Sequence, residues 1–184
     1  MVVVVMKNCI CITGLAGKFT ENITKKLAKE LDLYYANVIN MLEFDIIDIR
    51  NTINICGLDY YKKLVAKKLK ELTTYENDIV YLNYYILQYS ECRPVIREKF
   101  ITIYLDLPEQ RYAKLIEDEN LTELEAKLEK GVYKPRNKHF SSICDIVVKC
   151  KNKSEMDIVN SIKKEIINYY KKVERHENRS KSGK

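Results

Sequence analysis

The stretch Cys9-Ile-Cys-Ile-Thr-Gly-Leu-Ala-Gly-Lys-Phe-Thr20 decides the fold, because its residue pattern changes twice within a short distance. The apolar run at its start is typical of a buried strand, and the two glycines that follow indicate a tight turn. Beyond Thr20 apolar residues recur every four positions with lysines between them, which predicts a helix. These positions are Ile23, Leu27 and Leu31. Strand, glycine turn and helix together form one βα unit.

The same alternation continues along the chain. Further strands are predicted at residues 33–36, 78–82, 100–105 and 146–148, and helices at 40–49, 57–72, 108–115, 121–130 and 155–170. Gly131 is expected to end the helix at 121–130 as a C-terminal cap. The segment 83–97, with its tyrosines and a breaker at Pro94, has no clear pattern. Alternating strands and helices predict an α/β fold, a three-layer parallel sheet of about five strands with helices on both faces.

Length and charge indicate one domain and a short basic tail. The 184 residues suit a single domain, expected over residues 1–170. Of the net charge of +6, residues 171–184 carry +4, from six Lys/Arg and two Asp/Glu. This tail is predicted to be disordered, and the rest of the chain is nearly neutral. Neither part carries a strong nucleic-acid signal, and no apolar run approaches the length of a membrane-spanning helix.

Cysteine and histidine usage indicates a reduced, cytoplasmic protein without a metal site. Cys9, Cys11, Cys144 and Cys150 lie in or beside β-branched runs, so we interpret them as reduced core residues and not as disulfide partners. The two histidines are isolated in the sequence, so no zinc site is predicted. No signal peptide is expected, because Lys7 follows the opening apolar run where a charged segment should precede it.

The first βα turn is the expected place for a ligand. In a parallel sheet, ligands bind beyond the carboxyl ends of the strands, and the helix N-terminus after the first strand attracts anions. A phosphate-binding loop, G-x-x-x-x-G-K-[ST], uses glycines for backbone N–H contacts, a lysine for phosphate oxygens and a hydroxyl for Mg²⁺. The candidate phosphate-binding residues here are Gly14, Gly17, Lys18 and Thr20. In the alternative interpretation, the two glycines simply close a tight turn.

The segment from Gly14 to Leu31 resembles the first segment of the shikimate kinases, which are small kinases with a phosphate-binding loop. That segment of the family reads approximately G-F-M-G-S-G-K-S-T-V-G-R-x-L-A-x-x-L. It aligns here without a gap, with agreement at Gly14, Gly17, Leu27, Ala28 and Leu31. The similarity extends over nearly the whole chain. It implies a P-loop kinase-like fold of the kind that the strand and helix pattern predicts.

In this register, residues that serve catalysis in the family are replaced. Phe19 stands for the second glycine of the loop, Thr20 for the lysine and Glu21 for the magnesium hydroxyl. The first change adds a side chain where the backbone should approach phosphate, the second removes a cation, and the third adds a negative charge. A rival register keeps Gly17-Lys18 as the glycine–lysine pair, with Thr20 as the hydroxyl, but places Ile12 where the loop needs a glycine.

The resemblance also implies positions for substrate groups. Asn37 falls where the family carries an Asp-x-Asp pair for magnesium and shikimate, and residues 82–84 replace a Gly-Gly-Gly turn. Lys62 falls on an arginine that binds the substrate carboxylate, which keeps the charge but loses the bidentate fork. Arg136 falls on a second substrate-binding arginine, or is simply a surface residue. The lid looks shortened and lacks a match to the catalytic arginine. Tyrosines with helical spacing are interpreted as packing and not as a base-stacking platform: Tyr81, Tyr85 and Tyr89.

These observations favour a non-catalytic kinase-fold protein that binds a small ligand or a protein partner, with no certain cofactor. The alternative is an active small-molecule kinase that uses ATP and Mg²⁺. In it, Lys18 replaces the lost lysine, and Lys62 with Arg136 holds an anionic substrate such as shikimate. A third hypothesis is that the basic tail contacts nucleic acid or a membrane surface.

Overall fold

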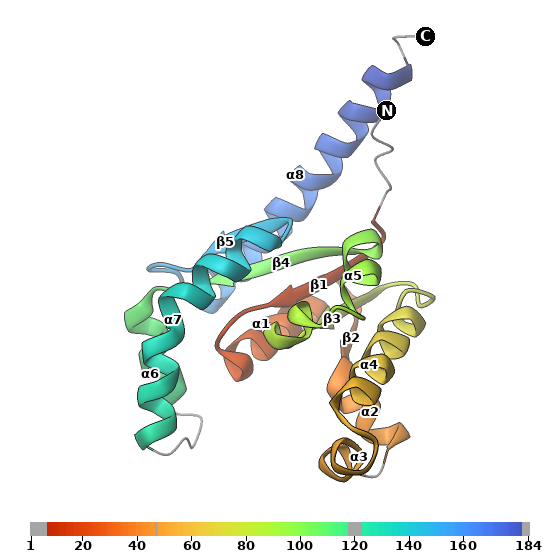
Figure 1. Ribbon diagram of the computed structural model, residues 1–184. Coiled ribbons are helices and arrows are strands. Elements are labelled where there is room, and N and C mark those ends of the chain that lie inside the picture. Colours follow the sequence, from red (N-terminus) through yellow and green to blue (C-terminus); the bar gives the residue numbers. More distant parts are fainter. Residues whose placement is uncertain (1–6, 47, 118–122, 182–184) are drawn as a thin grey trace.

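The fold is built on a five-stranded sheet in which every strand runs parallel to its neighbours. The computed structural model describes residues 7–46, 48–117 and 123–181. The strands are β1 (Cys9–Thr13), β2 (Tyr34–Asn37), β3 (Asp78–Tyr81), β4 (Phe100–Asp106) and β5 (Ile146–Lys149). Their spatial order is β2-β3-β1-β4-β5 (Figure 1), which confirms the predicted parallel sheet.

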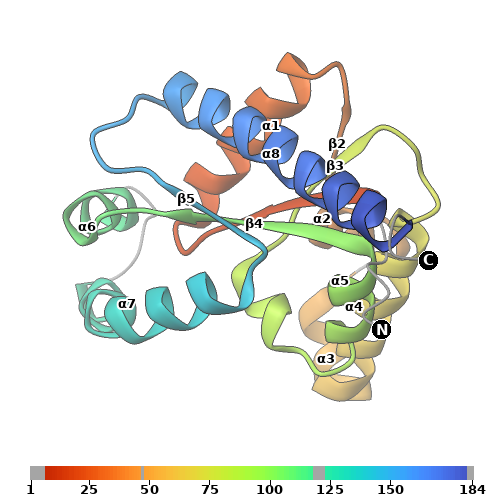
Figure 2. The same cartoon turned by 90° about the horizontal axis from the view of Figure 1, so that it is seen from above.

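Helices cover both faces of the sheet, as predicted. On one face lie α1 (Gly17–Glu30) and α8 (Glu155–Lys181), and on the other α4 (Leu58–Leu72), α5 (Arg93–Lys99) and α7 (Glu123–Ile143), as Figure 2 shows. Further helices follow the carboxyl ends of strands: α2 (Val38–Asp45), the 3₁₀ helix η1 (Tyr84–Gln88) and α6 (Glu109–Glu117). Helix α3 (Ile49–Cys56) follows α2. Within the described ranges, none of these helices is long and apolar enough to cross a membrane.

The central strands β1 and β4 form the most deeply buried part of the domain. All five residues of β1 are buried. In β4, Phe100, Ile101, Ile103 and Tyr104 are inaccessible to solvent, because helices cover both faces of the sheet. The turn after β1 therefore starts from a rigid frame at the middle of the sheet.

The prediction that Gly131 ends a helix is wrong. Helix α7 continues through Gly131 and Pro135 to Ile143. A glycine inside a helix costs only about 1 kcal/mol relative to alanine. Beyond it, the side chains of Tyr133 and Phe140 are buried against the domain. Tertiary packing thus outweighs the local preference for a helix end.

The last helix is also longer than predicted. Helix α8 does not end at Tyr170 but continues to Lys181, across the start of the segment expected to be a tail. Val173 lies seven residues after Ile166, on the same side of the helix, and both side chains are buried. The Tyr170 hydroxyl donates to the Lys7 carbonyl oxygen at 3.5 Å. The apolar stripe of α8 therefore extends past residue 170.

Two segments differ from or add to the predicted elements. The single helix predicted at 40–49 is in fact two helices, α2 and α3, which begin at the side-chain caps of Asn37 and Asp48. Helix α3 ends at Gly57, whose φ of 83° favours glycine. The unassigned segment 83–97 forms η1 and most of α5.

The cysteines contribute packing. All six are free thiols, and Cys9, Cys11, Cys92 and Cys150 are buried. Burial raises the pKa of Cys92 and of Cys150 to about 12. Both thiols are therefore neutral and unreactive at ordinary pH.

Candidate functional site

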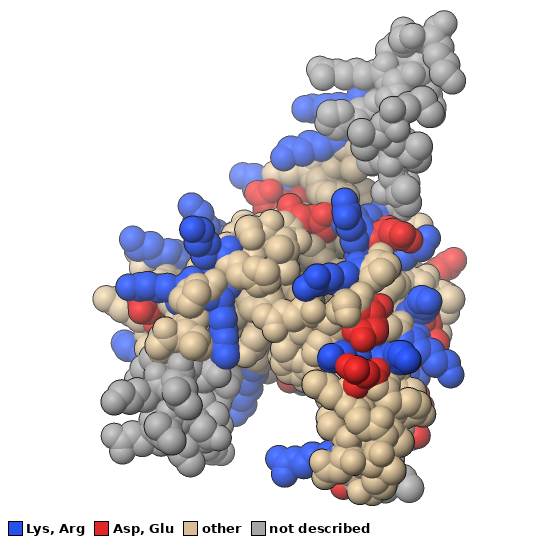
Figure 3. Space-filling model, viewed as in Figure 1, with Lys and Arg blue, Asp and Glu red and all other residues tan. Residues whose placement is uncertain are grey.

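The molecular surface is hollowed at the carboxyl ends of the strands. Figure 3 shows this hollow beside the part formed by α2, α3 and α4. The turn between β1 and α1 lies at this edge of the sheet (Figure 1). The hollow is the place where parallel sheets of this kind bind ligands.

The turn between β1 and α1 is short and closed. Only Gly14, Leu15 and Ala16 separate the strand from the helix, and all three are buried. Helix α1 begins at Gly17, and the Thr20 N–H already donates to the Ala16 carbonyl oxygen at 2.9 Å. In a phosphate-binding loop, backbone N–H groups stay free for the anion. Here α1 starts early, so the Thr20 N–H forms a hydrogen bond within the helix and is not free for an anion.

Close packing explains Gly14 and leaves little room beside Gly17. A Cβ atom added at Gly14 would lie 2.6 Å from Thr20 Oγ1 and 3.4 Å from Leu105 Cβ. One added at Gly17 would lie 3.2 Å from the hydroxyl oxygen of Tyr81. The contact of α1 with the strands therefore requires a glycine at position 14 whether or not an anion binds there. The Tyr81 hydroxyl, from the end of β3, occupies the space beside Gly17.

Thr20 and Lys18 differ in exposure. The Thr20 side chain is fully buried, and its hydroxyl donates to the Ala16 carbonyl oxygen at 2.7 Å. This hydroxyl therefore stabilises the first turn of α1 and does not face the hollow. Lys18 is exposed at the second position of the helix. Among the candidate phosphate-binding side chains, Lys18 is the one at the surface.

Phe19 fills the space beside the turn. Its side chain is 6% exposed, and the guanidinium carbon of Arg111 lies 4.9 Å from its ring centroid. Arg111, on α6, also donates to the carbonyl oxygens of Cys150 and Lys153 at 3.0 and 2.8 Å. Phe19 and Arg111 thus join α1, α6 and the connection between β5 and α8. Sequence reasoning missed Arg111, because no local pattern distinguishes it from other helical cations.

Glu21 and Asn37, which the resemblance placed at magnesium positions, are held by other partners. Glu21 Oε1 accepts a hydrogen bond from the Tyr35 hydroxyl and pairs with Lys25 Nζ, both at 2.8 Å. Burial acts to raise the pKa of Glu21, but the hydrogen bonds from Lys25 and Tyr35 outweigh it and lower the pKa. Asn37 Oδ1 accepts from two backbone N–H groups of α2.

These groups do not fit a magnesium ion. Mg²⁺ requires near-octahedral oxygen ligands, and the one carboxylate at this place already accepts from a lysine and a tyrosine. Among the residues whose structure is described, no group of three or more His, Cys, Asp or Glu side chains is arranged to hold a metal ion.

A row of tyrosines joins Lys62 and Arg136. The Arg136 guanidinium carbon lies 5.7 Å from the Tyr84 ring centroid, and Lys62 Nζ lies 5.8 Å from that of Tyr89. Tyr85 contacts both rings, with centroids 6.0 Å apart in each pair. The two cations predicted to hold an anionic substrate therefore lie at opposite ends of one aromatic row. The sequence predicted packing for Tyr85 and Tyr89 but not this link between α4 and α7.

Arg136 is positioned by the docking of α7 on the end of β4. Asn137 Nδ2 donates to Asp106 Oδ1 at 2.9 Å, and Asn137 Oδ1 accepts from the Tyr104 hydroxyl at 2.7 Å. These bonds fix α7 at Asn137, the residue that follows Arg136. The Arg136 guanidinium in turn donates to the Tyr84 hydroxyl at 3.3 Å.

Comparison with known proteins finds matches to shikimate kinases along most of the chain. A family model described as shikimate kinase matches residues 16–167. A shikimate kinase of Clostridium botulinum (strain Eklund 17B / Type B) is 25% identical over 166 residues, which cover 89% of this chain and 99% of that protein.

Solved structures share the fold. The shikimate kinase of Aquifex aeolicus is 21% identical with a TM-score of 0.65, covering 88% of this chain and 97% of that one. A shikimate kinase of Acinetobacter baumannii in complex with shikimate is 15% identical with a TM-score of 0.71, covering 90% and 96%. Because the family model spans most of the chain and the five-stranded parallel sheet agrees with these structures, the chain belongs to the shikimate kinase family.

Proposed function

We propose that this chain is a non-catalytic member of the shikimate kinase family that binds a small anionic ligand. The observation that carries the proposal is the closed turn before α1. The Phe19 ring beneath Arg111 and the Tyr81 hydroxyl take up the space around this turn. The Thr20 hydroxyl is bonded to the turn itself. The Thr20 hydroxyl and N–H, and the space beside the turn, are thus already occupied by contacts within the fold.

The charges at the turn also argue against phosphoryl transfer. Such transfer depends almost entirely on positioning and on cations that neutralise the phosphate oxygens. In the ungapped register this chain has Thr20 for the lysine and Glu21 for the magnesium hydroxyl, and Asn37 replaces a carboxylate. Losing a single electrostatic group commonly costs about 100-fold or more in turnover. Losing three together leaves little catalysis.

The ligand is expected at the aromatic row between Lys62 and Arg136. Tyrosine faces supply apolar contact area, and the cations at the two ends supply charge. Asp59 Oδ1 lies 3.0 Å from Lys62 Nζ, so Lys62 would share its charge between Asp59 and a ligand. The relative from Acinetobacter baumannii was solved with shikimate, a small carboxylate. A small carboxylate is therefore the ligand class to test first.

A second candidate function is supported by one observation, the exposure of Lys18 at the start of α1. In that function the chain is an active kinase that transfers phosphate from ATP to a hydroxyl of a small anionic substrate such as shikimate. Lys18 would then supply the cation that Thr20 lacks.

A turnover assay and a binding measurement separate the two functions. With ATP, Mg²⁺ and shikimate we expect no product above the enzyme-free blank. Calorimetric titration with shikimate should show binding that weakens roughly ten-fold, about 1.4 kcal/mol, in Arg136→Ala. The control is Arg175→Ala, which removes an exposed arginine of α8. Turnover that Lys18→Ala abolishes would overturn the non-catalytic assignment. Absence of shikimate binding to the native chain would overturn the ligand class and leave a protein partner to be sought.

A further inference from the structure

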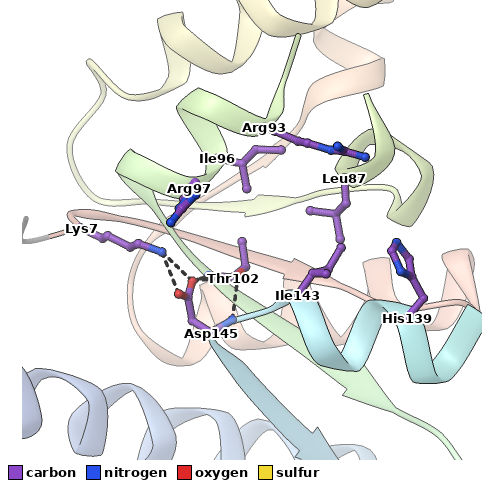
Figure 4. Close-up of a pocket in the computed structure, with 9 residues that line it drawn as sticks. All are labelled: Lys7, Leu87, Arg93, Ile96, Arg97, Thr102, His139, Ile143 and Asp145. Carbon is purple, nitrogen blue, oxygen red and sulfur yellow. Dashed lines mark hydrogen bonds and ion pairs between the residues drawn. The ribbon is translucent and has the colours of Figure 1, made fainter. Parts of the chain in front are cut away.

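A separate cavity of about 490 Å³ lies at the amino ends of the strands. Its lining includes Lys7, which precedes β1, and Asp145, which precedes β5. The other walls come from β4, η1, α5 and α7 (Figure 4). None of the candidate phosphate-binding or substrate-binding residues lines it. The cavity is therefore distinct from the hollow at the carboxyl ends.

Basic side chains predominate among the charged groups that line the cavity. Arg93 and Arg97 come from successive turns of α5, and Figure 4 shows them along one wall with His139 and Asp145 on the opposite wall. Lys7 adds a third positive charge. Among the described lining residues, Asp145 is the only acid.

The carboxylate of Asp145 is fully engaged in the fold. It accepts from Lys7 Nζ at 2.8 Å on each oxygen. Its Oδ2 also accepts from the backbone N–H and the hydroxyl of Thr102, both at 2.8 Å. These bonds satisfy the N–H and the hydroxyl of Thr102, just before β4 begins to pair with β5 at Ile103. Lys7 and Asp145 therefore neutralise each other, and no second acid among the described lining residues balances the two arginines.

The arginines keep donors available to a ligand. In the described part of the chain, the Arg97 side chain makes no hydrogen bond or ion pair. Arg93 donates from Nη2 to the Gln88 carbonyl oxygen at 3.3 Å, which leaves its other N–H groups. Both side chains are exposed at the cavity. Guanidinium groups present a planar fork of donors that matches a phosphate or carboxylate.

Apolar side chains complete the site. Leu87 and Ile96 are buried in its wall, and Ile143 is 47% exposed there. The volume falls in the range of roughly 300 to 1,000 Å³ that small-molecule sites occupy. We propose that this cavity binds a small organic anion that carries a phosphate or carboxylate group on an apolar body. This site is independent of the function proposed for the carboxyl edge.

Titration with three small probes tests the proposal. Phenyl phosphate carries a phosphate on a phenyl ring, and benzoate carries a carboxylate on the same kind of ring. Benzyl alcohol has the ring without a charge and serves as the neutral control. We expect saturable binding of at least one anion, observed as shifts of the backbone amide signals of α5 in NMR spectra, and none for benzyl alcohol. The anion that binds more tightly identifies the preferred group.

Variants locate the binding. Arg97→Ala should weaken the bound anion roughly ten-fold, about 1.4 kcal/mol, and Arg93→Ala should act in the same direction. Lys99→Ala is the matched control, because it removes a charge from an exposed residue of α5 that does not line the cavity. Arg136→Ala should leave this binding unchanged, which separates it from the site proposed at the carboxyl edge. Equal weakening by Lys99→Ala, equal binding of benzyl alcohol, or no saturation by either anion would overturn the proposal.

Discussion

The guanidinium carbon of Arg111 lies 4.9 Å from the ring centroid of Phe19, and this contact closes the carboxyl edge of the sheet between α1 and α6. A cation over an aromatic face contributes about 0.5 to 1 kcal/mol at a partly exposed site. The two carbonyl oxygens that Arg111 also contacts hold the guanidinium in place. The Phe19 ring is thus part of the packing between α1 and α6.

Phe19→Ala should therefore both destabilise the fold and open the turn. We expect a loss of about 2 to 4 kcal/mol in urea unfolding, the range for truncating a buried aromatic side chain. The affinity for ADP, measured by calorimetry, should rise, because the N-terminus of α1 becomes accessible. Phe44→Ala is the control, since Phe44 is 91% exposed and its loss should change neither quantity. Unchanged stability and unchanged ADP affinity in Phe19→Ala would contradict the conclusion that the Phe19 side chain fills the space beside the turn.

Thr20→Lys should fail to restore a phosphate-binding lysine. The side chain at position 20 is fully buried beneath Gly14, so the new ammonium group would be removed from water. We expect a loss of at least about 2 kcal/mol in unfolding free energy and no gain in ADP affinity. Lys18→Ala, at an exposed position, should be nearly neutral for stability. A stable Thr20→Lys variant with tighter ADP binding would show that the turn rearranges to present the lysine.

Gly131→Ala should stabilise the protein. The glycine lies within α7, and a Cβ atom there meets nothing within 4 Å. Alanine loses less backbone entropy in a helix, so thermal or urea unfolding should show a gain of about 0.5 to 1 kcal/mol. Gly14→Ala is the opposite case, because its Cβ would lie 2.6 Å from Thr20 Oγ1. It should cost about 1 to 3 kcal/mol. Destabilisation by Gly131→Ala would favour the helix end predicted from the sequence.

Asp78→Asn should remove a pH-dependent loss of stability. Burial raises the pKa of Asp78 to about 6, and its Oδ2 has no hydrogen-bond partner. Between about pH 4 and 6 the folded protein keeps a proton that the unfolded chain releases, so stability falls as the pH rises. The variant should gain about 1 kcal/mol over the native chain on going from pH 4 to pH 7, a value limited by partial solvent screening. Glu76→Gln changes an exposed neighbour and keeps Asp78, so its stability relative to the native chain should not change between pH 4 and pH 7.

Removal of residues 171–184 should cost a small amount of stability. Val173 is buried on the stripe of α8 that also buries Ile166. Loss of this contact should lower the unfolding free energy by about 1 kcal/mol. A chain ended after Arg175, which keeps Val173, is the control and should match the full chain. Equal stability of the two shortened chains would show that the contact of Val173 contributes nothing.

Local patterns in the sequence determined the parallel sheet with helices on both faces, the place of the first turn and the likeness to the shikimate kinases. Those features depend on residue periodicity and on short segments, which can be read along the chain. The tertiary structure alone decided that α7 passes through Gly131, that Thr20 points inward, and that Arg111 covers Phe19. It also decided that Lys7 and the arginines of α5 meet in one cavity. Apart from the local contacts of Thr20 with Gly14 and Ala16, these features depend on contacts between residues far apart in sequence. The packing energy of such contacts exceeds the small local preferences that the sequence displays.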